Sequence, residues 1–369
     1  MSSRKPRQPA DRGNRPSSGD GLTRRQVLKG LAAGGLLAGS GLLSSCGQPG
    51  TEATQAGTSA AGADLSSGRT ARRDGVVVIV RHPRAIDDQR RVDGEIVARM
   101  VQAGVTRLAE TSGPAEAWRR FFSPSDVIGL KVNCLGAPST HTHTEVVLAA
   151  AAGLQAAGVA AENLIIFDRL TSELRRAGFA VNEETGVRCF GTERRGYDSQ
   201  PTVVGAVGSC FSRIVSEDCT ALLNLPLLKD HDVAGVSLAL KNHFGSINNP
   251  NKLHLNHCCP YVADLNLAPQ IRTKERLIVA DALEAIYDGG PTYRPSTTEA
   301  YGALLIGTDP VAVDRIGWQI IDDLRRTAGL RTLAEVGREP AYIDVAADEE
   351  HNLGVADLSR INKVEVSLT

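Results

Sequence analysis

The sequence lacks the features that mark several large classes of protein. Its 369 residues hold 41 Lys and Arg against 42 Asp and Glu, and only 4% are aromatic. This charge balance excludes a strongly basic nucleic-acid-binding protein, while 42% hydrophobic and 22% charged residues are typical of a globular chain. There is no G-x-S-x-G motif, and no G-x-G-x-x-G follows the first expected strand. Neither a serine hydrolase nor a dinucleotide-binding fold is therefore indicated.

The N-terminal segment carries the pattern of an export signal. Arg24 and Arg25 precede a glycine-rich apolar stretch, residues 27–43, that is too short for a good stop-transfer helix. Residues 43–47 then have the form of a lipobox, which predicts lipidation of Cys46. We expect recognition by the twin-arginine export machinery and a lipid anchor on the outer (periplasmic) face of the cytoplasmic membrane. The alternatives are an uncleaved anchor, or an ordinary signal followed by a chance cysteine.

Composition divides the chain into three parts. Residues 1–45 form the predicted twin-arginine lipoprotein signal. Residues 46–75 are rich in Gly, Ala, Ser and Thr with almost no large apolar residue, which predicts a flexible tether. Residues 76–369 form the predicted folded domain.

Short apolar runs alternate with helical patterns in this domain. The predicted strands are residues 76–80, 126–132, 164–167, 219–225, 277–280 and 304–307, with 364–368 at an edge. The predicted helices are residues 94–103, 144–157, 172–177, 261–272 and 311–324, with a helical turn at 236–242. This alternation predicts an α/β fold with a mostly parallel sheet and helices on both faces. Residues 181–212 fit neither pattern, so we expect an irregular insertion of strands and loops.

Polar side chains gather near the ends of two predicted strands and in the stretch that follows. The candidate ligand-binding residues are Lys131, Asn133, Lys229, His231, Lys241 and Asn242. Open parallel sheets bind ligands beyond the carboxyl ends of their strands, and a lysine beside an asparagine can hold a carboxylate or a phosphate. The alternative is that each lysine pairs with a buried acid such as Asp281 or Asp314.

Histidine and cysteine are concentrated between residues 229 and 259. The candidate metal ligands are His254, His257, Cys258 and Cys259, joined by His141 or His143. Imidazole and thiolate suit zinc, iron or copper, although the spacing matches no familiar zinc or iron–sulfur signature. The alternative is that these histidines bond to the backbone and that the six cysteines after Cys46 are small buried residues rather than ligands or half-cystines.

Five ordered segments resemble the bacterial and archaeal family called domain of unknown function 362. They are residues 127–133 (VIGLKVN), 224–231 (NLPLLKDH), 236–245 (VSLALKNHFG), 277–291 (LIVADALEAIYDGGP) and 308–314 (TDPVAVD). Members of that family are sometimes found with ferredoxin-type iron–sulfur modules, so the resemblance implies a redox or metal setting and a redox partner. This chain lacks the cysteine-rich ferredoxin segment, and the family supplies no settled activity.

Two functions therefore compete at this stage. One is a metal-dependent enzyme of redox or hydrolytic type, and the other is a non-catalytic binding protein for a small anionic ligand. The sequence names neither the substrate nor the reaction, and the only cofactor it points to is a metal ion.

Overall fold

The computed structural model describes residues 74–369, which belong to one compact unit. The predicted export signal, Cys46 and nearly all of the predicted tether lie outside the described residues. Between Asp74 and Thr369 no helix is both long and apolar enough to cross a membrane.

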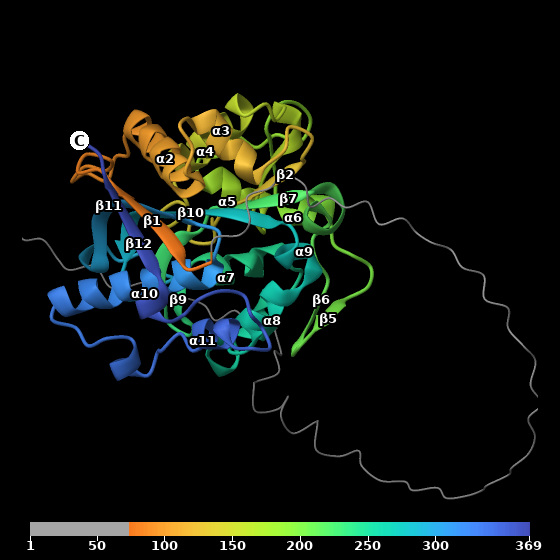
Figure 1. Ribbon diagram of the computed structural model, residues 1–369. Helices are drawn as coiled ribbons and strands as arrows, with labels where there is room; N and C mark the ends of the chain where they lie inside the picture. Colours follow the sequence, from red (N-terminus) through yellow and green to blue (C-terminus); the bar gives the residue numbers. More distant parts are fainter. Residues whose placement is uncertain (1–73) are drawn as a thin grey trace, which may run out of the picture. The chain divides into compact units, whose positions relative to one another are not determined.

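A sheet of ten strands forms the centre of the described residues (Figure 1). Its strands are β1 (Val76–Arg81), β2 (Ile128–Lys131), β3 (Leu164–Phe167), β4 (Arg188–Cys189), β7 (Ala221–Asn224), β8 (Leu227–His231), β9 (Gly235–Ser237), β10 (Glu275–Ile286), β11 (Thr298–Gly307) and β12 (Asn362–Ser367). The order is β12-β1-β11-β10-β7-β2-β3-β4, with β8 pairing to both β10 and β9. Only β11 against β1 and β10, and β9 against β8, are antiparallel. The mostly parallel sheet predicted from the sequence is confirmed.

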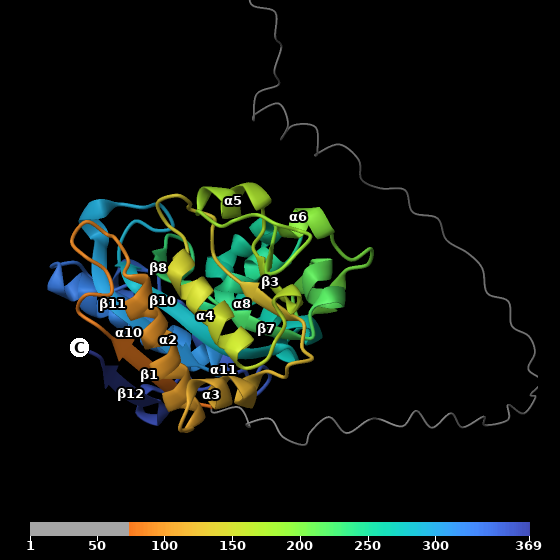
Figure 2. The ribbon, with the colours of Figure 1, turned by 90° about the horizontal axis from the view of Figure 1, so that it is seen from above.

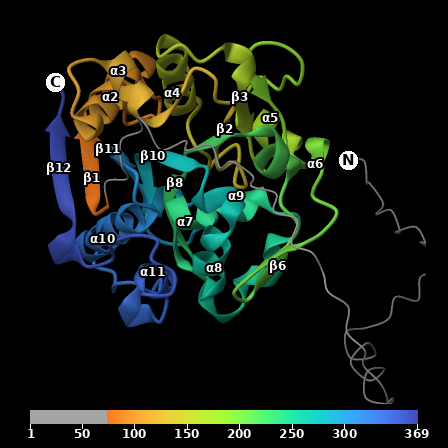
Figure 3. The ribbon, with the colours of Figure 1, turned by 45° about the vertical axis from the view of Figure 1, so that its right-hand side comes forward.

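Helices cover both faces of the sheet (Figure 3). One face carries α2 (Gly94–Ala109), α3 (Pro114–Phe121) and α4 (Thr144–Ala156), and the other carries α8 (Tyr261–Leu267), α10 (Pro310–Thr327) and α11 (Tyr342–Ala347). Helices α2 and α4 lie side by side (Figure 2). Asp93 begins α2 because its carboxylate accepts hydrogen bonds from the N–H groups of Glu95 and Ile96.

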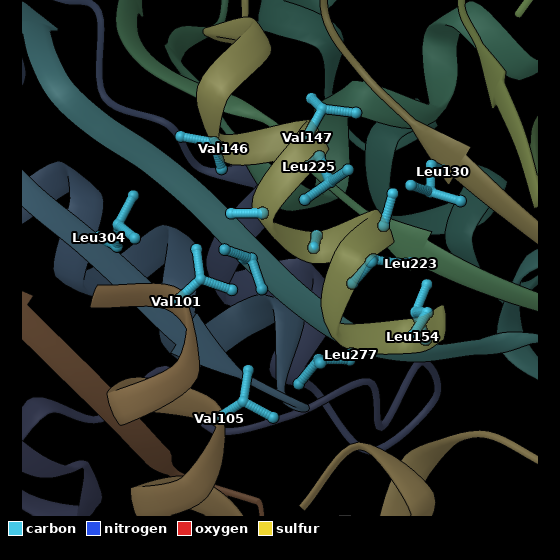
Figure 4. Close-up of a cluster of buried hydrophobic side chains, with 14 of the residues drawn as sticks. Val101, Val105, Leu130, Val146, Val147, Leu154, Leu223, Leu225, Leu277 and Leu304 are labelled. Carbon is cyan, nitrogen blue, oxygen red and sulfur yellow. The ribbon is translucent and has the colours of Figure 1, made fainter. Parts of the chain in front are cut away.

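The largest apolar core lies between the sheet and helices α2 and α4 (Figure 4). Leu130 of β2, Leu223 of β7 and Leu277 of β10 are fully buried there, together with Val101 of α2 and Leu154 of α4. Burying one such side chain stabilises the fold by about 1.5–3 kcal/mol. This core fixes the central parallel strands, and therefore the positions at which their carboxyl ends lie.

The remaining chain builds an irregular region beside the central strands. It contains the short helices α5 (Thr171–Arg176), α6 (Thr192–Arg195), α7 (Ala239–Asn242) and α9 (Pro269–Arg272), and a separate antiparallel pair, β5 (Thr202–Val204) with β6 (Val207–Ser209). Residues 181–212 accordingly hold β4, α6 and the β5–β6 pair, which agrees with the expected irregular insertion.

Several predicted boundaries were wrong for identifiable reasons. Residues 236–242 are not one helical turn, because 235–237 form β9 opposite β8 before α7 begins. The predicted helix over 261–272 is divided into α8 and α9 at Pro269, which has no N–H to continue the hydrogen-bonding ladder. The strand predicted at 277–280 extends to Glu275–Ile286 because it pairs with β11 over most of its length.

Candidate ligand-binding site

All six candidate ligand-binding residues line one pocket, with a cavity volume of about 80 Å³. Lys131 ends β2 and Asn133 follows it, while Lys229 and His231 lie on β8. Lys241 and Asn242, which also line the pocket, end helix α7. Strands β2 and β8 belong to the parallel part of the sheet, so the pocket lies beyond carboxyl ends of parallel strands, where this architecture places ligands.

Lys131 is a fully buried lysine with a complete set of partners. Its Nζ donates to Asp168 Oδ1 at 2.8 Å, to the carbonyl of Val132 at 2.5 Å and to Asn242 Oδ1 at 3.2 Å. Gly245 packs against this ion pair, and a Cβ at that position would lie 2.5 Å from Asp168 Oδ1. The charge of Lys131 is therefore neutralised within the protein.

Lys229 and Lys241 are buried lysines of a different kind. Lys229 Nζ donates to Asn133 Oδ1 at 2.8 Å. Lys241 Nζ lies 3.2 Å from His254 Nε2 and 4.3 Å from the centre of the Phe244 ring. Among residues 74–369, no carboxylate forms an ion pair with either lysine. Both ammonium groups are thus held by neutral partners alone.

Burial shifts the proton equilibria of these two lysines. Burial lowers the pKa of Lys229 to about 8, and repulsion from Lys241 acts in the same direction. Burial likewise lowers the pKa of Lys241 to about 8, against weaker attraction from Cys258 and Asp232. A charged amine loses hydration when buried, so its neutral form is favoured. Any anion that enters the pocket would reverse this shift.

The two pocket histidines are neutral. His231 Nδ1 accepts hydrogen bonds from the N–H groups of Val233 and Ala234 at 3.1 and 3.3 Å, so the ring proton lies on Nε2. Burial, followed by the charge of Lys241, lowers the pKa of His231 to about 2. His254 stacks on His231 with ring centres 5.5 Å apart, and burial lowers its pKa as well. The histidines therefore add neutral donors and acceptors to a cationic pocket.

A buried carboxylate holds helix α7 in place. Asp314 of α10 accepts hydrogen bonds from the N–H groups of Ala239 and Leu240, at 2.6 and 3.3 Å. Burial raises the pKa of Asp314 well above its usual value, and these backbone donors offset only part of that shift. Because α7 carries Lys241 and Asn242, Asp314 positions two pocket side chains without lining the pocket itself.

A chain of amides runs from the pocket through the protein. Asn242 donates to Asn224 Oδ1 at 2.8 Å, and Asn224 donates to Glu275 Oε2 at 2.7 Å. His243 Nε2 lies 2.7 Å from the same carboxylate oxygen. Glu275 also lines a second pocket of about 210 Å³, which contains none of the candidate ligand-binding residues. The larger cavity therefore lies apart from the lysine cluster.

The candidate metal ligands are not gathered into one site. Among the described residues, no group of three or more His, Cys, Asp or Glu side chains is placed to hold a metal ion. His254 faces Lys241, while the exposed His257 has its Nδ1 3.1 Å from the carbonyl of Val233. Cys258 is buried and Cys259 is half-buried.

Backbone geometry explains why these candidate metal ligands, which are close in sequence, are separated in space. Asn256, His257 and Cys258 adopt left-handed conformations with φ of 47°, 55° and 63°, so successive side chains leave the chain in different directions. Burial also raises the pKa of both cysteines, which favours thiols over the thiolates that metals bind. All six cysteines after Cys46 are free in the structure, as expected of small, mostly buried residues.

The acids proposed as alternative lysine partners are engaged elsewhere. Asp281 accepts from the backbone N–H of His143 at 2.8 Å and lies 2.7 Å from its Nδ1. His141 approaches the His143 ring, with centres 6.0 Å apart, but is not part of this pair. Asp314 holds α7, as described above. The alternative that each lysine pairs with a buried acid therefore holds for Lys131, whose partner is Asp168. Asp281 and Asp314, however, do not pair with Lys229 or Lys241.

Several pocket residues escaped the sequence analysis. The most important are Asp168, Arg169, Glu173, Phe244 and Asn251. Asp168 directly follows β3, so the rule that selected Lys131 also applied to it. Glu173 pairs with Arg169 at 2.7 Å, and burial raises the pKa of this carboxyl group. Nothing in the local sequence marked Phe244 as the wall beneath Lys241.

These features define an α/β protein with a cationic pocket at the carboxyl edge of its parallel strands. Residues 128–319, just over half of the chain, match the model of a family described as Domain of unknown function (DUF362). The chain belongs to this family, as the resemblance had indicated. No curated protein matches the chain.

Proposed function

We propose that this protein binds a small anion of the carboxylate or phosphate class between Lys229 and Lys241. The observation that carries the proposal is the burial of two lysines in one pocket without a carboxylate partner from residues 74–369. Burying a charged group costs several kcal/mol unless an opposite charge compensates it. A bound anion would supply that charge, while Asn133 and His231 could donate hydrogen bonds to its oxygens.

The pocket favours a small ligand, or the small reactive end of a larger one. Its volume of about 80 Å³ is well below the roughly 150 Å³ of a cavity that holds benzene. Arg169 lies at the pocket but is already paired with Glu173, and Lys131 is paired with Asp168. The positive charge that remains for a ligand therefore comes from Lys229 and Lys241.

Calorimetric titration of the full chain with inorganic phosphate and with lactate tests this proposal. Lys229→Met and Lys241→Met should each weaken binding by about 1.5–3 kcal/mol, or roughly 10- to 100-fold, which is the scale of a hydrogen bond to a charged group. Lys363→Met, which removes an exposed lysine on β12, should leave the affinity unchanged. The proposal would be refuted if neither phosphate nor lactate bound, or if all three variants bound them with equal affinity.

We also propose that the protein acts outside the cytoplasm, because Arg24 and Arg25 precede an apolar stretch of the kind that twin-arginine signals carry. Arg24→Lys combined with Arg25→Lys should leave the precursor in the cytoplasm, as measured by cell fractionation. Normal export of that double variant would contradict this assignment.

The lipobox supports a membrane anchor at Cys46. Cys46→Ala should release the processed protein into the soluble fraction, because each buried CH₂ of a lipid chain contributes about 0.8 kcal/mol to membrane binding. If the processed variant stays with the membrane, lipidation at Cys46 is not the anchor.

A further inference from the structure

The three buried lysines of the pocket differ in what their nitrogens contact. Lys131 is ion-paired with Asp168, and Lys229 donates to the amide oxygen of Asn133, an acceptor that favours the charged ammonium. Lys241 instead faces the imidazole of His254, with Nζ 3.2 Å from Nε2. An ammonium group can only donate, so Nε2 is the accepting nitrogen and can take a proton from Lys241. Among the described residues, only this lysine of the pocket has an imidazole beside its nitrogen.

We propose that Lys241 forms a reversible imine with a small 2-oxo acid whose carboxylate is held by Lys229. This inference rests on the anion-binding function proposed above and adds the chemical class of the ligand. A lysine becomes a nucleophile toward carbonyl carbon when it is desolvated, or when a second cation lies nearby. Lys241 is buried, which meets the first condition, and a second cation, Lys229, lines the same pocket.

The surroundings of Lys241 suit this chemistry. The Phe244 ring, 4.3 Å from Nζ, forms an apolar wall that limits the access of water to the amine. With the pKa of Lys241 lowered to about 8, about one amine in ten is neutral at pH 7. For an exposed lysine the corresponding fraction is below about one in a thousand. A reactive amine is therefore present at neutral pH without a metal ion or a cofactor.

The step balances with the groups at hand. The neutral Nζ of Lys241 attacks the carbonyl carbon, and a C–N bond forms as the C=O π bond breaks and one of the two Nζ protons passes through His254 Nε2 to the oxygen, which gives a carbinolamine. His254 Nε2 then takes the second proton from the nitrogen and passes it to the hydroxyl group, which leaves as water. The products are an imine and one water molecule, and no oxidant or reductant is consumed. Hydrolysis by the reverse path frees the lysine.

Reductive trapping of the full chain tests the imine. The protein is incubated with pyruvate and cyanoborohydride, which reduces an imine to a stable secondary amine, and the adduct is located by peptide mass spectrometry. We expect one adduct on the peptide that contains Lys241. Lys241→Arg keeps the positive charge but cannot form the imine, so the adduct should disappear. The matched replacement Lys363→Arg on β12 should leave the labelling unchanged.

The role of His254 as a base is tested by a measurement that the loss of a merely structural residue would not change. His254→Gln should slow adduct formation at saturating pyruvate by about 100-fold or more, the usual contribution of a positioned general base. The loss of affinity for lactate, which has no carbonyl carbon to attack, should be at least about tenfold smaller than the loss of trapping rate. An equal loss of lactate affinity and of trapping rate would contradict the assignment of His254 as the base.

The outcomes separate this inference from the function on which it rests. Binding of lactate and pyruvate without any trapped adduct would overturn the imine and leave anion binding intact. Labelling that persists in Lys241→Arg would also overturn it. Failure of the chain to bind lactate, pyruvate and phosphate would refute the anion-binding proposal itself.

Discussion

Two buried sites in this protein hold charge in opposite ways. At one, His143 and Asp281 pair with Nδ1 and Oδ2 2.7 Å apart, and Asp281 is fully buried. Burial opposes both charged forms, but the attraction and hydrogen bonding between the partners, together with smaller contributions from their neighbours, outweigh it. The pKa of His143 is raised to about 9 and that of Asp281 is lowered. At the other site, Lys229 and Lys241 are buried without a carboxylate partner from the described residues, and their pKa values fall to about 8.

The difference separates a structural site from a binding site. The His143–Asp281 pair is complete within the protein, so its removal should affect folding. The lysine pair is incomplete, so its removal should affect a ligand. The following predictions test that distinction, from the largest expected effect to the smallest.

Asp281→Ala should have the largest effect on stability. It leaves His143 without its partner and removes the acceptor for the His143 backbone N–H. Breaking a buried ion pair from one side lowers the free energy of unfolding by about 3–5 kcal/mol, which urea denaturation followed by circular dichroism would measure. Glu349→Ala, at an exposed position, should change it by less than about 0.5 kcal/mol. If Asp281→Ala lowered the free energy of unfolding by less than about 1 kcal/mol, the His143–Asp281 pair would not be the structural site described here.

Replacing both Lys229 and Lys241 by methionine should not lower the free energy of unfolding, in contrast to Asp281→Ala. In anion-free buffer, replacing buried charges by apolar side chains of similar length should leave the free energy of unfolding unchanged or raise it by about 1–4 kcal/mol. Phosphate should stabilise the wild type, by about 2.7 kcal/mol at 100 times its dissociation constant, and should not stabilise the variant. A loss of more than about 2 kcal/mol in anion-free buffer would mean that the lysines are structural after all.

The pH dependence of stability should also have opposite signs at the two sites. The folded pKa of His143, about 9, lies above its ordinary value of 6.5. Its stabilisation is therefore fully present below pH 6.5 and is lost as the pH rises toward 9. For Lys229 and Lys241 the folded pKa, about 8, lies below the ordinary 10.5, so the unfolded chain binds more protons between these values. Their contribution to stability should therefore rise with pH across that window.

Difference measurements isolate these contributions from those of other titrating groups. The free energy of unfolding of the wild type minus that of His143→Gln should fall between pH 6.5 and 9. The wild type minus the double methionine variant should rise between pH 8 and 10.5. Each proton contributes a slope of at most about 1.4 kcal/mol per pH unit. Slopes of the same sign would show that the two sites do not differ in the manner described.

The smallest effect is expected at His257, which was predicted as a metal ligand together with His254. His257→Ala should change phosphate affinity by less than about twofold, because the side chain is exposed and bonds to the carbonyl of Val233 rather than lining the pocket. Metal analysis of wild type and variant, both purified after export, provides the second measurement. Metal that is bound by the wild type and lost in His257→Ala would support the metal-site prediction.

The fold and much of the pocket could be predicted from sequence for one physical reason. Parallel strands buried on both faces are continuous apolar runs, and their carboxyl ends point to the same edge of the sheet, so the polar residues after them lie close together. This rule selected Lys131 and Asn133, and it applied equally to Asp168. It also selected Lys229 and His231, as residues that follow the predicted strand 219–225. They lie instead on β8, a fully buried strand that the sequence did not predict, and the partners of Lys229 and Asp230 come from distant segments.

The metal prediction depended on sequence adjacency, which is weaker evidence than a strand end. Side chains that are adjacent in sequence lie close in space only when the backbone directs them to the same side. The left-handed conformations from Asn256 to Cys258 direct them to different sides. A non-glycine residue in that conformation is uncommon, and no local pattern in the sequence announced three in succession. The positions of His254 and His257 could therefore not be inferred without the structure.

The amide chain beneath the pocket has a direction. At Asn242 the oxygen faces the Lys131 ammonium and the nitrogen faces Asn224, whose own nitrogen faces the Glu275 carboxylate. Each side-chain amide dipole thus points its negative end toward the lysine end of the chain and its positive end toward Glu275. The charges at the two ends favour this orientation of each amide over the flipped one. Asn133 accepts from Lys229 and donates to Asn242 Oδ1, so an anion that cancels the charge of Lys229 weakens that preference. The side-chain amide resonances of Asn224 and Asn242 should therefore report pocket occupancy from inside the sheet.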